Sequence, residues 1–187
     1  MLNIDELNVK MEVAESDSSI VDGITTQVVS TYADDLDRLM AETHQFVTEE
    51  EYTLKTLEEF LLKLSSTLYF VGSNLEKIGI RDDIAKQLKS NKYNDTYLGT
   101  LTSAEINKTK KTVAEVTAIA ENESQYESAV NLIYSRAYKI LKFKVESGYR
   151  MVDTLKKCMS KRIAEMQLSG FDGGTTFSFD TMGEDIV

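Results

Sequence analysis

The chain contains no proline and no tryptophan, and its only cysteine is Cys158. Proline interrupts helices and starts many loops, and its average use is about 5%. Its absence from 187 residues therefore favours long helices with short connections. A single thiol excludes an internal disulfide and fits a reducing compartment. We expect Cys158 to be a small apolar residue on a helix.

Long hydrophobic runs are missing as well. No apolar stretch reaches the roughly 18 residues that a membrane-spanning helix needs, and no basic segment leads into an apolar run at the start. We therefore expect no membrane span and no signal peptide, and a cytoplasmic location.

Signals of enzymatic chemistry are few. The only histidine, His44, falls on an acidic helical segment, where we expect a surface role. The chain has no Cys/His metal-ligand spacing, no phosphate-binding loop and no nucleophile elbow. Paired acids such as Asp34 and Asp35 are adjacent in sequence and do not face each other on a helix. The sequence predicts a non-enzymatic protein without a cofactor, a metal site or a small-molecule substrate.

Charge is sorted along the chain. Residues 1–65 hold 15 acidic and 4 basic residues, and residues 168–187 hold 4 acidic and no basic ones. Residues 66–167 carry a net charge of +5, although the whole chain carries −10. Within them, residues 136–162 hold 9 basic and 2 acidic residues. This basic segment either meets phosphates or meets the acidic ends of its own chain.

Apolar periodicity divides the chain into three parts. Residues 1–22 are acidic with weak periodicity, which predicts a flexible arm. Residues 23–168 carry apolar residues at 3–4 spacing, which predicts a helical domain. Residues 169–187, with four glycines, three phenylalanines and no basic residue, predict a disordered acidic tail. The tail is either a docking peptide or a solubilising extension.

Capping boxes and glycines set the expected helix boundaries. The first helix is predicted to start at about Ile24, and Thr48 with Glu51 forms a capping box that opens the second. Gly72 and Ser73 are expected to end or bend this second helix, with an interruption near Gly79.

A loop is predicted over residues 90–103. Thr112 with Glu115 forms a second capping box and Ser124 with Glu127 a third. The third box either restarts a helix or lies on a continuous one.

The last helix is predicted to be long, at about residues 124–168. Its apolar residues alternate at spacings of 4 and 3, which is typical of a heptad-like seam. Because so long a helix is not buried inside a small monomer, the seam needs partner helices from this chain or from other copies, and we expect a homo-oligomer. The seam consists of Val130, Ile133, Ala137, Leu141, Val145, Val152, Leu155 and Met159.

Cations on the same helix form a stripe roughly opposite the seam, at about 100° per residue. Such cations around an aromatic ring suit single-stranded nucleic acid, because cations neutralise phosphates and rings stack on bases. The alternative is a solvated Lys/Arg face with a ring covered by a neighbouring helix. Lys144 and Arg162 fall on the seam side, where they pair with acids or line an oligomer cavity. The predicted stripe comprises Arg136, Lys139, Phe143, Arg150, Lys157 and Lys161.

A second candidate cluster lies at the predicted end of one helix and in the following loop. It contains three lysines and a tyrosine, although lysines near a helix end are also favoured by the helix dipole alone. Its members are Lys86, Lys89, Lys92 and Tyr93.

The order of these elements resembles the UvsY family of phage recombination mediators over about residues 57–167. The similar pieces are an amphipathic helix (LEEFLLKLSSTLYFVGSNLEKI), a Lys-rich turn with tyrosine (IAKQLKSNKYNDTYL), a Lys-led helix (KKTVAEVTAIAENESQYE) and the long last helix. The resemblance implies a protein of the host cytoplasm that binds single-stranded DNA and assists recombinase loading. It further implies that the Lys-rich turn contacts DNA, that the last helix drives oligomerisation, and that the partners include a recombinase or a single-strand-binding protein.

The sequence therefore predicts an all-α protein, a helical hairpin or bundle with a long coiled-coil-like C-terminal helix and flexible acidic termini. Two other functions stay open. One is an oligomeric structural or adaptor protein, such as a phage assembly component, in which residues 1–50 would cover the basic stripe. The other is an acidic decoy that inhibits a host DNA-binding protein.

Overall fold

The computed structural model describes residues 4–48 and 53–170, with side chains from residue 18 to residue 169 outside the gap. These ranges form helices with no strand, so the all-α prediction is confirmed. The helices are α1 (Ile4–Thr48), α2 (Leu54–Ile106), α3 (Val113–Glu123) and α4 (Gln125–Gly170). The long C-terminal helix is also confirmed, because α4 covers nearly the predicted residues.

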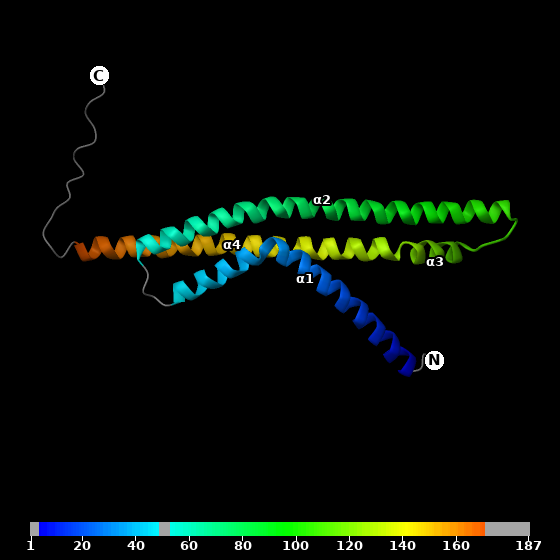
Figure 1. Cartoon of the computed structure of the whole chain (residues 1–187), viewed down its shortest axis with the longest axis horizontal. Coiled ribbons are helices and arrows are strands. Elements are labelled where there is room, and N and C mark those ends of the chain that lie inside the picture. Colours follow the sequence, from blue (N-terminus) through cyan, green and yellow to red (C-terminus); the bar gives the residue numbers. More distant parts are fainter. Residues whose placement is uncertain (1–3, 49–52, 171–187) are drawn as a thin grey trace, which may run out of the picture.

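The helices form an elongated rod (Figure 1). Helix α2 runs antiparallel to α3 and α4, which follow each other along its side, and the hairpin turns between α2 and α3. Helix α1 packs on α4 and α2 with its C-terminal half, while its N-terminal half bends away from the rod (Figure 1). Three helices of one chain therefore share one core.

That core contains the predicted seam of α4. Ala137, Leu141, Val145, Val152 and Leu155 are buried, and the other three seam residues are half-buried. Leucines of α2 face them, and α1 adds a valine, an alanine and two leucines to the same cluster. Much of the seam thus finds its partner helices within this chain. The buried α1 and α2 members of the cluster are Val29, Ala33, Leu36, Leu39, Leu57, Leu64, Leu68, Val71 and Ile78.

Helix α1 begins at Ile4, so residues 4–22 of the predicted flexible arm belong to a helix. Apolar residues continue at 3–4 spacing ahead of Ile24, at Ile4, Leu7, Met11 and Ala14. The acidic residues between them made this periodicity look weak in the sequence. Asp and Glu near a helix N-terminus nevertheless stabilise the helix, because they complement its dipole. The predicted helix start at Ile24 is wrong.

The first predicted capping box is wrong too. Thr48 ends α1, where its hydroxyl donates to the carbonyl oxygens of His44 and Gln45. The N-cap of α2 is Thr53, whose hydroxyl accepts from the backbone N–H of Thr56, and the Thr56 hydroxyl accepts from the Thr53 N–H in return. A threonine at the third helical position thus replaces the glutamate on which the prediction relied.

Helix α2 runs without a break through three predicted interruptions. Gly72 lies in the helix interior, and Gly79 leaves room for the Tyr138 ring, which a Cβ would approach to 3.2 Å. The loop predicted over residues 90–103 is helical, because α3 packs along this part of α2, where Ala104 and Val116 are buried. Tertiary packing outweighs the weak helix propensity of the Asn, Asp, Thr and Gly residues there.

The connections at the far end are short. The Thr112–Glu115 capping box is confirmed at the start of α3. Lys108 takes the left-handed conformation (φ 53°) in the turn before it. At Ser124 the helix stops and restarts as α4, which settles the alternative left open for the third box in favour of a restart. Of the predicted acidic tail, residues 171–187 lie outside the described part of the chain.

No described helix combines the length and apolar character that a membrane crossing requires.

Candidate nucleic-acid interface

The basic stripe of α4 lies on a face that α2 does not cover. The seam residues turn toward α2 and α1, so residues on the opposite side of the helix are left in solvent. Along the chain these exposed residues repeat at intervals of four and seven, which keeps them in one row. The exposed row comprises Lys139, Phe143, Arg150, Lys157 and Lys161.

Phe143 is the unusual member of the row. Its side chain is 66% exposed, so no neighbouring helix of the described chain covers it. The alternative of a solvated Lys/Arg face required a neighbouring helix to cover the Phe143 ring, and the structure does not show this cover. Lys139 lies one turn before Phe143 and Arg150 two turns after it, and both are exposed. Exposing an apolar ring to water is unfavourable. A base that stacks on this ring would cover it, while the cations on either side contact the phosphates.

Arg136, at the N-terminal end of the stripe, has a partner. Its guanidinium forms an ion pair with Asp22 of α1. Asp22, Thr25 and Thr26 of α1 line a hollow of about 410 Å³ together with Arg136 and Lys139. Helix α1 therefore covers the first turn of the stripe and leaves the rest open.

Lys144 shows the same relationship with α1. Its ammonium lies 2.6 Å from Oδ1 of Asp37, so pairing with an acid, one of its two predicted fates, is the one observed. Helix α1 carries 10 acidic and 2 basic residues, whereas α4 carries 9 basic and 4 acidic ones. Opposite charges thus meet along the α1–α4 contact.

The remaining cations of α4 are either free or paired locally. Arg162 and Lys161 approach Glu165 of their own helix at 3.3 and 3.8 Å. Such exposed pairs contribute at most about 1 kcal/mol. Arg150 and Lys157 form no ion pair with the described residues, so they are available to an anionic partner.

The second predicted cluster lies inside α2 and not at a helix end. Lys86, Lys89 and Lys92 are exposed, while Tyr93 is half-buried and stacks on Tyr97 with ring centroids 6.1 Å apart. The dipole argument for these lysines fails, because α2 continues to Ile106. The lysines flank the beginning of α4 and belong to a different helix from the α4 stripe.

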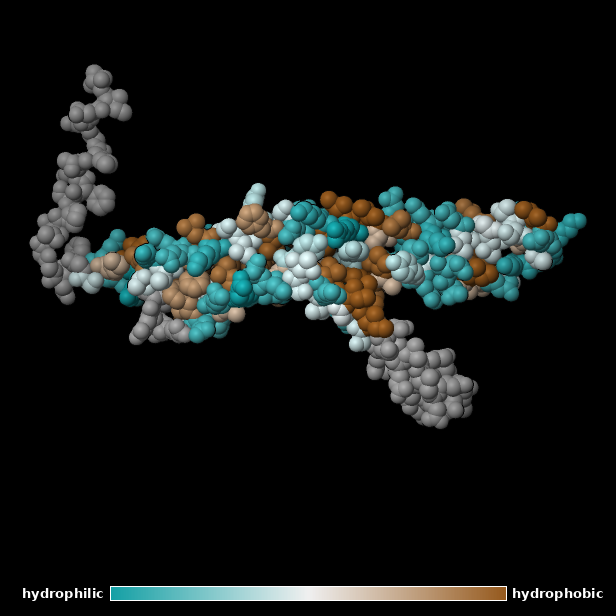
Figure 2. Space-filling view, viewed as in Figure 1, coloured by the Kyte–Doolittle hydropathy of each residue, from teal (hydrophilic) through white to brown (hydrophobic). Residues whose placement is uncertain are grey.

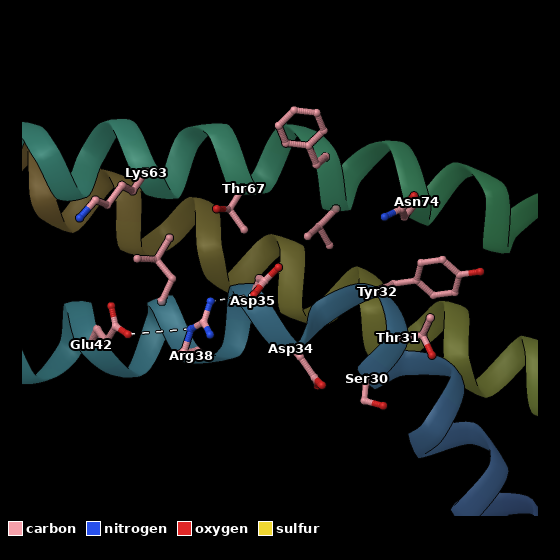
Figure 3. Close-up of a pocket in the computed structure, with 13 residues that line it drawn as sticks. Ser30, Thr31, Tyr32, Asp34, Asp35, Arg38, Glu42, Lys63, Thr67 and Asn74 are labelled. Atoms are coloured by element: carbon pink, nitrogen blue, oxygen red, sulfur yellow. Dashed lines mark hydrogen bonds and ion pairs between the residues drawn. The ribbon is translucent and has the colours of Figure 1, made fainter.

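A groove that the sequence did not predict lies between α1 and α2 (Figure 3). It encloses about 890 Å³, and its α1 side carries Arg38 between Asp35 (2.8 Å) and Glu42 (4.0 Å). Lys63, Thr67 and Asn74 line the α2 side (Figure 3). The opposite charges nearly balance. No sequence signal marks the groove, because its walls come from helices that are distant in the chain.

No metal-ligand cluster is present in the described part of the chain. No three of its His, Cys, Asp and Glu side chains gather as metal ligands would. Cys158 is half-buried on α4 and packs against the core cluster, which agrees with the small apolar helix residue that was predicted.

No family model, no curated protein and no solved structure matches this chain.

Proposed function

We propose that this protein is a non-enzymatic accessory factor that binds single-stranded DNA through the open part of the α4 stripe. Phe143 carries the proposal, because it is an aromatic ring left 66% exposed in a row of cations. A solvated helix face has no need of a phenylalanine, whereas stacking on a base buries its ring. Lys139, Arg150 and Lys157 supply phosphate contacts on either side.

The biological setting follows from the resemblance to UvsY mediators. In that setting the protein assists the loading of a recombinase onto single-stranded DNA in the host cytoplasm. The elongated rod supports this role, because a row of cations along α4 suits an extended single strand better than a compact ligand. Because the whole chain carries a net charge of −10, DNA should approach the basic face of α4 and avoid the acidic helix α1.

Fluorescence anisotropy of labelled oligo-dT tests the proposal. Phosphate contacts release counterions, so the logarithm of the affinity should fall linearly with the logarithm of the salt concentration between about 50 and 200 mM. Each phosphate contact on a single strand contributes about −0.7 to this slope. If roughly three or four free cations act together, the total slope should therefore be about −2 to −3. Undetectable binding at about 50 mM salt overturns the proposal.

An adaptor protein is the second candidate, and one observation favours it. Asp22 and Asp37 of α1 already neutralise Arg136 and Lys144 of α4. In an adaptor the basic residues of α4 serve to hold the acidic α1 in place. Absence of oligo-dT binding by the full chain, together with an α1–α4 contact that weakens with salt, selects this alternative.

A further inference from the structure

Helix α1 is held to the core over only part of its length. From Val29 onwards it buries a side chain at nearly every turn. Between residues 18 and 27, where the description of its side chains begins, only Thr25 is buried. Ile20 and Ile24 are 59% and 43% exposed, and Figure 2 shows a hydrophobic patch on α1 close to where it leaves the rod. Residues 18–27 therefore gain little from packing.

A bend separates this segment from the rest of α1. The hydroxyls of Ser30 and Thr31 both donate to the carbonyl oxygen of Gln27, at 3.0 and 2.8 Å. Such back-bonding competes for a helical carbonyl and bends helices. The bend turns the first half of α1 away from the rod (Figure 1). It supplies a hinge between the packed and the unpacked part of the helix.

The contact of this segment with α4 is sparse. In the described chain one ion pair joins them, between Asp22 and Arg136, whose side chains are 59% and 39% exposed. Beneath the segment lies the hollow of about 410 Å³ that Ile140 of α4 also lines. Thr25 lines it too, and its Oγ1 is shielded from solvent without a hydrogen-bond partner among the described residues. An unpaired buried hydroxyl is unfavourable, and opening to water would satisfy it.

The Asp22 carboxylate occupies a position that suits a phosphate. A guanidinium binds carboxylate and phosphate oxygens with the same donors. Arg136 precedes Lys139 by one turn and Phe143 by two turns on the α4 stripe. Once Asp22 leaves it, Arg136 therefore extends the open row of cations by one further phosphate contact.

We propose that residues 18–27 form a displaceable lid, in which the Asp22 carboxylate holds the place of a DNA phosphate on Arg136. The lid rests on the proposed function, because single-stranded DNA on the α4 stripe is what displaces it. A strand held at Lys139 and Phe143 carries its next phosphate to Arg136, releases Asp22 and opens the lid about the hinge. Such a tethered phosphate competes better than a free anion, because its other contacts raise its effective concentration.

Thiol labelling tests the lid without DNA. Thr25 and Thr43 are buried threonines of α1, 2% and 0% exposed, on opposite sides of the hinge. In a Cys158→Ser background, Thr25→Cys should react with a maleimide at least about tenfold faster than Thr43→Cys, because the labelling rate follows local opening. Asp22→Asn should speed labelling of Thr25→Cys about two- to fivefold and leave Thr43→Cys unchanged. Equal rates for the two thiols, or no response to Asp22→Asn, overturn the lid.

The same thiols test displacement by DNA. Saturating oligo-dT should raise the labelling rate of Thr25→Cys and leave that of Thr43→Cys unchanged. A rate for Thr25→Cys that stays constant or falls, while anisotropy shows the strand bound, overturns displacement and leaves the proposed DNA site standing. If the wild type binds no oligo-dT, the proposed function and displacement by DNA both fail, whereas the labelling without DNA still decides whether the lid exists.

Discussion

Gly148 of α4 lies directly against the side chain of Leu68 in α2. A Cβ at position 148 would stand 2.5 Å from one Leu68 methyl carbon and 3.3 Å from its Cγ. Leu68 is itself only 1% exposed, so its side chain lies inside the core and cannot turn out into solvent without losing that burial. Among the glycines described, Gly148 marks the closest approach of α4 to α2.

Replacing this glycine should therefore lower stability. Gly148→Ala improves intrinsic helix propensity by about 1 kcal/mol, but the overpacked core costs about 1–3 kcal/mol, so we expect a net loss. Gly72→Ala is the matched control, because nothing lies within 4 Å of its added Cβ, and it should gain up to about 1 kcal/mol. Urea unfolding followed by circular dichroism measures both. Equal gains in the two variants would contradict the observed α2–α4 register.

Removing acids from α1 should increase DNA affinity if the proposed site is correct. Asp22→Asn with Asp37→Asn releases Arg136 and Lys144 from their ion pairs. An exposed ion pair is worth up to about 1 kcal/mol, so oligo-dT affinity should rise about two- to fivefold. Anisotropy at fixed salt measures the change.

The control for this variant changes net charge equally. Glu76→Gln with Asp83→Asn removes two exposed acids from α2, away from these pairs. Its affinity should change less, since its effect is only long-range and screened. An equal increase in both variants would mean that total charge, and not the α1 contact, limits binding.

The capping box of α3 makes stability depend on pH. The backbone N–H of Thr112 donates to Oε2 of Glu115 at 2.8 Å, and this bond, helped by the Thr112 hydroxyl, lowers the pKa of the Glu115 carboxyl. A lowered pKa in the folded state means that the charged form stabilises the fold. This stabilisation is complete above the pKa of the unfolded chain and disappears as the pH falls through the lowered folded pKa.

Glu115→Gln should therefore lower the melting temperature at neutral pH and lose this effect in acid. Melting curves of wild type and variant between about pH 2 and 7 should converge at the acidic end. Glu121→Gln, an exposed change in the same helix, should show a smaller difference throughout. A gap between wild type and Glu115→Gln that stays constant over this range would show that the charge of Glu115 is not what caps α3.

Local sequence signals predicted some parts of the fold well. The apolar seam of α4 and the Thr112–Glu115 box depend on spacing within a few residues, and both lie where they were predicted. Residues 90–103 failed for the opposite reason. Their composition is that of a loop, and they are helical because α3 packs against them from the other side of the hairpin. Spacing along the chain contains no information about that neighbour.

The candidate site shows the same division. Helical angles placed Lys139, Phe143 and Arg150 on one face, and their exposure agrees with it. The pairing of Arg136 with Asp22 joins residues 114 positions apart, so only the fold reveals which end of the stripe is occupied. The sorted charge of the sequence indicated that acids and bases could meet, but it did not identify the pairs.

Phe143→Ala gives the most direct test of the proposed site. Stacking of a base on an aromatic side chain is worth about 1–3 kcal/mol, so the affinity for oligo-dT should fall at least about fivefold. The salt slope should stay unchanged, because the phosphate contacts remain. Tyr149→Ala is the matched control, since Tyr149 is 55% exposed on α4 but outside the stripe, and it should bind as wild type. Equal weakening by both variants, or none by Phe143→Ala, would place the DNA away from this face and leave Phe143 to contact a protein partner.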